Sequence, residues 1–153
     1  MIVLKQSPYA IVCQAGQWVY KIASIEFTLN EYRWTSAMAK RGYAPVCLML
    51  DAHTIRTRYL GNQAESWSSV TDPYEFLSHK PLLLGALKDA GVRHGDLTRY
   101  AVIVVDNKPY LIDFAQSRSI HSTLPDKRPQ GDEFWLSKTM DEILEMSRKE
   151  KER

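Results

Sequence analysis

Two aspartates that bracket one short hairpin constrain this chain more than any other feature. Asp96 stands shortly before the stretch Ala101–Val105, and Asp113 follows directly after Tyr110–Ile112. Apolar and β-branched residues predict a strand in each stretch, and Asp106-Asn107-Lys108-Pro109 between them predicts the turn. Because a hairpin returns the chain to the edge from which it started, we expect both carboxylates at the same end of it.

A pair of carboxylates in this position is typical of phosphoryl transfer. One carboxylate orients or deprotonates the attacking hydroxyl, and the other holds a Mg²⁺ ion that neutralises the phosphate oxygens. Asp96 and Asp113 taken singly have a simpler interpretation, because Asp is common in turns and at strand ends. Their position on both sides of a hairpin, directly after a predicted helix, favours the functional interpretation.

That helix has the clearest start signal in the chain. Asp72 is the predicted N-cap, Pro73 takes the first helical position, and Glu75 completes a capping box. We expect Pro81 to break or kink the helix and Gly91 to end it.

The other elements predict an α+β chain. A helix is expected from Leu29 to about Arg41, with Thr28 as N-cap, Glu31 as its capping-box partner and Gly42 as the stop. The order of strands, helix, strands, helix, hairpin and helix contains no alternating βαβ pattern. Further strands are expected at residues 11–14, 18–22, 46–50 and 54–60, and a last helix from near Asp132.

Composition is that of an ordinary globular protein. The chain has 153 residues, of which 44% are hydrophobic, so we expect one folding unit or two small lobes. The net charge of +2 permits a nucleic-acid partner but does not argue for one. Cys13 and Cys47 are expected to be buried thiols in a reducing cytosol. No apolar run approaches the length of a membrane span, so we expect a soluble, cytoplasmic protein without a membrane partner.

The stretch around the two aspartates is similar to a known family. H-G-D-L-T-R-Y-A from His94 and Y-L-I-D-F-A-Q-S ending at Ser117 resemble the catalytic loop and metal-binding segment of the RIO family of atypical kinases. The small kinase of the KEOPS complex is a second similar family, but the I-D-F-A-Q-S ending is closer to RIO. The resemblance implies a minimal bilobal protein-kinase-like fold, with residues 1–58 as a small N-lobe and 59–153 as a reduced helical C-lobe.

The resemblance also implies roles for individual residues. Asp96 would be the catalytic aspartate, and Asp113 would bind the metal and, as proposed for RIO proteins, accept phosphate as an ATPase intermediate. His94 would brace the loop, Lys21 would contact the ATP phosphates, and Glu31 would pair with Lys21. Without the resemblance, Lys21 reads as a solvent-facing strand residue and Glu31 as a capping-box residue.

Three further positions match the family more weakly. Tyr59 and Leu60, just before Gly61, resemble the hinge that receives adenine. Asp132 resembles the aspartate that supports the catalytic loop. The hinge residues also fit an ordinary edge strand, and Asp132 also fits an N-cap.

The chain departs from the family pattern at two places. The catalytic-loop asparagine, five residues after the aspartate, is replaced by Ala101, which removes a metal ligand. The expected phosphate-covering loop, Lys5–Ala10, contains no glycine, so close approach of its backbone to phosphates is less assured. In addition, Gln116–Gln130 would have to serve as the whole activation segment, which argues against peptide phosphorylation.

Four hypotheses therefore remain open. The first is an ATP-binding RIO-like Ser/Thr kinase or ATPase that uses Mg²⁺ or Mn²⁺ and acts on an unknown protein acceptor. The second is a pseudokinase that serves as a binding module, and the third is a small-molecule phosphotransferase similar to the aminoglycoside kinases. The fourth is an association with RNA or a ribonucleoprotein, suggested by RIO analogy and by five arginines: Arg56, Arg58, Arg93, Arg99 and Arg118.

Overall fold

The computed structural model describes residues 1–153, and its N-terminal part is a five-stranded antiparallel sheet. The strands are β1 (Ile2–Gln6), β2 (Ala10–Ala15), β3 (Trp18–Ala23), β4 (Cys47–Asp51) and β5 (Thr54–Arg58). Their order across the sheet is β1-β2-β3-β5-β4, so β3 lies in the middle.

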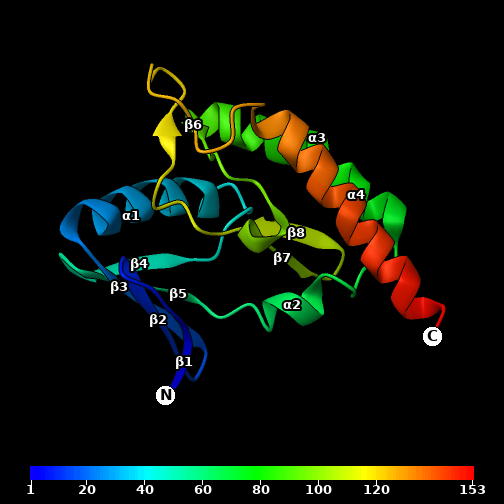
Figure 1. Ribbon diagram of the computed structural model, residues 1–153, viewed down its shortest axis with the longest axis horizontal. Helices are drawn as coiled ribbons and strands as arrows, with labels where there is room; N and C mark the ends of the chain where they lie inside the picture. The colour runs from blue at the N-terminus through cyan, green and yellow to red at the C-terminus, as the bar shows by residue number, and fades with distance from the viewer.

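Helix α1 (Ile25–Ala39) lies across one face of this sheet (Figure 1). It begins after Ser24, whose hydroxyl accepts a hydrogen bond of 3.2 Å from the backbone N–H of Phe27. The prediction that Thr28 caps the helix is therefore wrong, because Ser24 offers the same cap one turn earlier. Thr28 is buried inside the helix, and Glu31 has no capping role.

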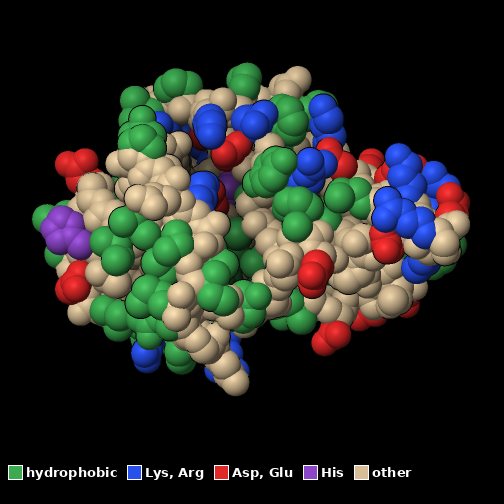
Figure 2. Space-filling model, turned by 60° about the horizontal axis from the view of Figure 1, so that its bottom comes forward, with side chains coloured by type: hydrophobic (Ala, Val, Ile, Leu, Met, Phe, Trp, Pro, Cys, Tyr) green, Lys and Arg blue, Asp and Glu red, His purple; other side chains and the backbone are tan.

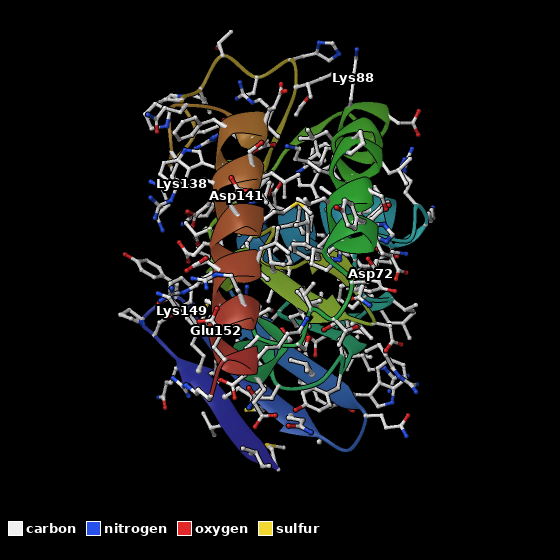
Figure 3. All side chains as sticks on the ribbon, turned by 90° about the vertical axis from the view of Figure 1, so that its right-hand side faces the viewer. Asp72, Lys88, Lys138, Asp141, Lys149 and Glu152 are labelled. Carbon is white, nitrogen blue, oxygen red and sulfur yellow. The ribbon has the colours of Figure 1, made fainter.

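The C-terminal part is mainly helical. Figure 1 shows the β7–β8 hairpin between the sheet and the long helices, and Figure 3 shows α3 and α4 side by side, with Lys138 and Asp141 on α4. The helical elements are α2 (Gln63–Ser66), α3 (Pro73–Ala90), the short 3₁₀ turn η1 (Arg99–Ala101) and α4 (Asp132–Lys151). Two small ladders pair β6 (Val92–Arg93) with β9 (Arg118–Ser119) and β7 (Val102–Val105) with β8 (Lys108–Leu111).

The N-cap Asp72, the first-turn Pro73 and the stop at Gly91 are confirmed for α3, but the capping box is not, because the backbone N–H of Asp72 donates to Oδ1 of Asn107 at 3.0 Å. The Asp72 side chain accepts from the backbone N–H of Glu75 at 3.1 Å, and Gly91 ends the helix with a φ of 73°. Of the break or kink expected at Pro81, the break is wrong, since α3 runs through it. Pro81 is exposed, and the apolar contacts that Phe76 and Leu83 make on the buried face of α3 outweigh the loss of one helical hydrogen bond.

The hairpin predicted between the two aspartates is confirmed, although its turn is shorter than Asp106–Pro109 because β8 begins at Lys108. In the β7–β8 turn, Asp106 and Asn107 both have positive φ, of 50° and 63°, which Asp and Asn tolerate better than most residues. Strand β1 was not among the expected strands, and it includes Lys5 and Gln6. The loop predicted at Lys5–Ala10 is therefore shorter and begins only at Ser7.

One apolar core joins the two parts of the chain. Its nineteen buried residues include Trp34 and Met38 of α1 together with residues of α3, α4 and the β7–β8 hairpin. Helix α1 thus packs on the sheet and on the C-terminal part, which fixes its position relative to the hairpin ends. The α+β prediction is confirmed. None of the helices combines the length and the apolar run that crossing a bilayer requires.

Candidate phosphoryl-transfer site

Lys21 makes the central contact of the site. It lies on β3, opposite Val12 and Ile55 of the neighbouring strands, so its side chain shares the sheet face with the buried Ile55. Its Nζ lies 2.6 Å from Oε2 of Glu31 on α1 and 3.2 Å from Oδ1 of Asp113. One ammonium group therefore bridges the sheet, the helix and the segment after β8.

The charges of this trio depend on each other. Burial opposes charge on Lys21, but Glu31 and Asp113 outweigh burial and raise the pKa of Lys21 above its ordinary value. Burial raises the pKa of Glu31, although Lys21 acts against this. Partial desolvation by its neighbours also opposes the charge of Asp113, but the attraction and hydrogen bond of Lys21 prevail and lower the pKa of Asp113. At neutral pH the site therefore presents a cation beside a carboxylate.

Asp113 stands in an unusual backbone conformation. Its φ is 69°, in the left-handed region that non-glycine residues seldom adopt, and its side chain is 44% exposed. The following Phe114 is fully buried, and its carbonyl accepts from the backbone N–H of Ser117 at 3.0 Å. We call residues 113–117 the Asp113 turn. This turn holds the carboxylate at the surface while its other end is anchored in the core.

The Asp96 loop, residues 93–98, lies beside this turn. His94 is buried, and its Nε2 donates to the carbonyl of Ile112 at 2.8 Å, while its Nδ1 accepts from the backbone N–H of Asp96 at 3.2 Å. Because a backbone carbonyl only accepts and a backbone N–H only donates, these two partners fix the tautomer of the neutral ring. The imidazole thus ties the loop to the residue just before Asp113.

Asp132 holds the same loop from the other side. Its two carboxylate oxygens accept from the backbone N–H groups of His94 at 2.8 Å and Gly95 at 3.0 Å. The alternative interpretation as an N-cap is wrong, because Asp132 is the first helical residue of α4 and the cap is Gly131. Gly95 has a φ of 85°, so glycine suits this bend.

The carboxylate of Asp96 is engaged by two cations from a distant segment. Arg128 Nε lies 2.6 Å from Oδ1, and Lys127 Nζ lies 3.3 Å from Oδ2. The backbone N–H of Arg128 also donates to the carbonyl of Gly95 at 3.1 Å. Figure 2 shows Lys, Arg and acidic side chains around a hollow with a histidine inside it.

The structure thus brings six of the predicted residues into two linked groups. Lys21, Glu31 and Asp113 form one, and His94, Asp96 and Asp132 form the other; the bond from His94 to Ile112 connects them. Tyr59 and Leu60 belong to neither group. They follow β5, half-buried, and the backbone N–H of Tyr59 donates to the carbonyl of Gln17 at 2.8 Å.

Sequence reasoning missed Asn30, Lys127 and Arg128, all of which contact these groups. Asn30 bonds to the Asp113 turn, and the other two bind Asp96. Only Asn30 carried a signal, since Asn is a poor residue for a helix interior and its presence there calls for a reason. Lys127 and Arg128 lie in a polar loop whose path no local pattern predicts.

The site offers little to a free metal ion. No three or more His, Cys, Asp or Glu side chains are grouped to hold one, and Ala101 is 3% exposed with no oxygen in its side chain. Mg²⁺ in nucleotide sites is commonly held by one or two carboxylates plus phosphate oxygens and water. Asp113, exposed and ionised, fits a Mg²⁺ that arrives together with a nucleotide.

Comparison with models of protein families finds a match. The model of the RIO domain matches residues 16–128, which is most of the chain and includes both groups of the site except Asp132. The chain belongs to the RIO family. RIO proteins are atypical kinases, so the family is one of phosphotransferases.

A solved RIO structure has the same fold. The chain is similar to the Rio2 kinase of Chaetomium thermophilum, solved as an ADP/Mg²⁺-phosphoaspartate complex, with a TM-score of 0.62 and 16% identity. The match covers 91% of this chain and 52% of the Rio2 chain, so this protein spans about half the length of its structural neighbour. A comparison with curated protein sequences finds no match.

Proposed function

We propose that this RIO protein binds ATP with Mg²⁺ beside Lys21 and transfers or hydrolyses the γ-phosphoryl group. The contact of Lys21 Nζ with Glu31 at 2.6 Å and Asp113 at 3.2 Å carries the proposal. A lysine held between two carboxylates at this junction suits the role of a fixed cation for phosphate oxygens, with Glu31 restricting where it points. Asp113 would hold the Mg²⁺, which would neutralise charge on the transferring group.

The two aspartates would divide the remaining chemistry. Asp96 would receive the proton of an acceptor hydroxyl as its oxygen attacks the γ-phosphorus and the bond to ADP breaks. Alternatively, a carboxylate oxygen of Asp113 would attack the γ-phosphorus, release ADP, and leave an acyl phosphate that water cleaves. The second route follows the phosphoaspartate named for the Rio2 complex and would make this chain an ATPase.

The test is ADP production with Mg²⁺ and with Mn²⁺ in three proteins: wild type, Asp113→Ala and Asp96→Asn. Loss of turnover in Asp113→Ala is expected for both routes. Loss in Asp96→Asn is expected only for transfer to a hydroxyl acceptor. Unchanged turnover in Asp113→Ala would remove Asp113 from the chemistry and overturn the proposal.

A nucleotide-binding module without turnover is the second candidate. The observation that favours it is the pairing of both Asp96 oxygens with Arg128 and Lys127, together with Ala101 at the metal-ligand position. A stable complex with ADP and Mg²⁺ and no ADP production from ATP would select this candidate. An RNA partner receives less support: Arg93 and Arg99 have acidic partners in the chain, Asp126 and Glu142, and Arg56 stacks on Trp18.

A further inference from the structure

Asn30 connects helix α1 to the Asp113 turn. Its Nδ2 donates to the carbonyls of Ala115 and Ser117, both at 2.9 Å, and lies 3.4 Å from the carbonyl of Phe114. These carbonyls are 84 to 87 positions away in the chain. The side-chain amide of Asn30 therefore donates hydrogen bonds to several backbone carbonyls of the Asp113 turn, which belongs to neither a helix nor a sheet.

The orientation of the Asn30 amide is fixed by what surrounds it. Trp34 Nε1 donates to Oδ1 of Asn30 at 3.2 Å, and an indole N–H can only donate. The three carbonyls on the other side can only accept. A flipped amide would set its oxygen against three carbonyl oxygens and its NH₂ against an N–H, so this orientation is strongly favoured.

The turn that Asn30 holds is the one that places Asp113. Asp adopts a positive φ more readily than most residues but still seldom, so the contacts that hold the turn help to keep Asp113 at its φ of 69°. Ser117, one of the residues bonded to Asn30, also donates through Oγ to the carbonyl of His94 at 3.0 Å. The same turn is thus tied to the Asp96 loop and, through Asn30, to the helix that carries Glu31.

We propose that Asn30 is a positioning residue that keeps the carboxylate of Asp113 in reach of a nucleotide-bound metal. Asn30 and Glu31 are adjacent on α1, so one helix sets both partners of Lys21: Glu31 directly, and Asp113 through the turn. This inference rests on the proposed function, since it assigns the placement of the metal-binding group. Removing the link would weaken the metal-dependent part of nucleotide binding and leave the Lys21–phosphate contact in place.

The sharpest variant is Asn30→Asp, which keeps the shape and the acceptor for Trp34 but turns the donor into an oxygen that faces three carbonyls. The matched control is Asn62→Asp, which makes the same change where only the oxygen is used: Asn62 Oδ1 accepts from the backbone N–H of Glu65 at 3.0 Å. Thermal unfolding of the full chain is followed with no ligand, with ADP, and with ADP plus Mg²⁺.

For wild type and Asn62→Asp we expect a shift with ADP and a further increase with Mg²⁺. For Asn30→Asp we expect the ADP shift without the further increase, equivalent to about 10- to 100-fold weaker metal-dependent affinity. A full Mg²⁺ increase in Asn30→Asp would overturn the inference. Absence of any shift in wild type, with ADP alone and with ADP plus Mg²⁺, would instead overturn the proposed function.

A second measurement uses the wild-type protein, so it tests the inference even if Asn30→Asp does not fold. In wild type, the side-chain NH₂ protons of Asn30 are observed by NMR, and we expect them to be protected from exchange and shifted by ADP with Mg²⁺ but not by ADP alone. Rapid exchange, or resonances that do not respond to Mg²⁺, would show that Asn30 does not hold the turn. This readout reports on the link even if turnover is absent.

Discussion

Lys21 Nζ lies 3.2 Å from Oδ1 of Asp113, although the residues are 92 positions apart in the chain. The same nitrogen lies 2.6 Å from Oε2 of Glu31. The contact is possible because α1 packs on the sheet and also contributes Trp34 and Met38 to the C-terminal core. The apolar packing of α1 thus sets the geometry of the charged site.

Variants of Lys21 and Glu31 distinguish the contribution of Lys21 to folding stability from its contribution to ADP binding. Lys21→Met leaves the buried carboxylate of Glu31 without its partner, and we expect unfolding in urea to become easier by about 3 kcal/mol. Adding Glu31→Gln removes the unpaired charge, so the double variant should recover most of that loss. Neither variant should bind ADP. A double variant that binds ADP as tightly as wild type would show that Lys21 has no part in nucleotide binding.

Freeing Asp96 should increase its reactivity. Arg128 Nε occupies Oδ1 of Asp96 at 2.6 Å, where an acceptor hydroxyl would be received. We expect Arg128→Gln to increase phosphoryl transfer by about tenfold, a small part of what a positioned base contributes, with unchanged ADP affinity. The control is Arg41→Gln, which removes an arginine ion pair with Asp89 of 2.8 Å on another part of the surface. Reduced transfer in Arg128→Gln would show that Arg128 assists the reaction.

Local signals were enough to predict the elements on either side of the Asp96 loop. The β7–β8 hairpin follows from strand-forming residues around Asp106-Asn107, and α3 follows from the Asp72 cap. Each of these signals acts within a few residues, so no knowledge of the tertiary structure is needed. The α+β order of elements could be predicted for the same reason, whereas its likeness to a kinase followed from the family resemblance.

Contacts between distant segments could not be predicted in this way. The cap was predicted at Thr28 and lies at Ser24, and without the family resemblance Glu31 had only a local role as a capping-box partner and no bond to Lys21. Arg128 reaches Asp96 across 32 positions of the chain, through a loop with no periodic pattern. Tertiary packing determines which distant residues come into contact, and local sequence patterns do not reveal it.

Placing the family's asparagine at position 101 should lower the folding stability and strengthen the binding of Mg²⁺. Ala101 is 3% exposed, so Ala101→Asn forces a larger polar side chain into a packed position, and we expect a loss of about 1–3 kcal/mol without ligand. With ADP present, the added amide oxygen should strengthen the dependence on Mg²⁺. Thermal unfolding with and without both ligands measures the two effects. An unchanged response to Mg²⁺ would show that position 101 does not face the metal.

Cys47 should make the fold sensitive to alkaline pH. Burial, reinforced by the charge of Glu31, raises the pKa of Cys47 from 9.0 to about 12. The folded state therefore favours the thiol, so its contribution to stability is complete below pH 9.0 and is lost as the pH rises toward about 12. Cys47→Ala should flatten the fall in unfolding free energy over this range. A fall as steep as in wild type would assign it to other groups, such as Tyr43, whose pKa burial also raises.

The most direct test of the nucleotide site is thermal unfolding of the wild-type chain with saturating ADP and Mg²⁺. Ligand at about 100 times its dissociation constant adds about 2.7 kcal/mol to the folded state, and for a chain of this size that corresponds to a rise of about 5–10 °C. We expect such a rise in wild type and none in the Lys21→Met/Glu31→Gln variant. An unchanged midpoint in wild type, with Mg²⁺ and with Mn²⁺ alike, would contradict nucleotide binding at Lys21 and Asp113.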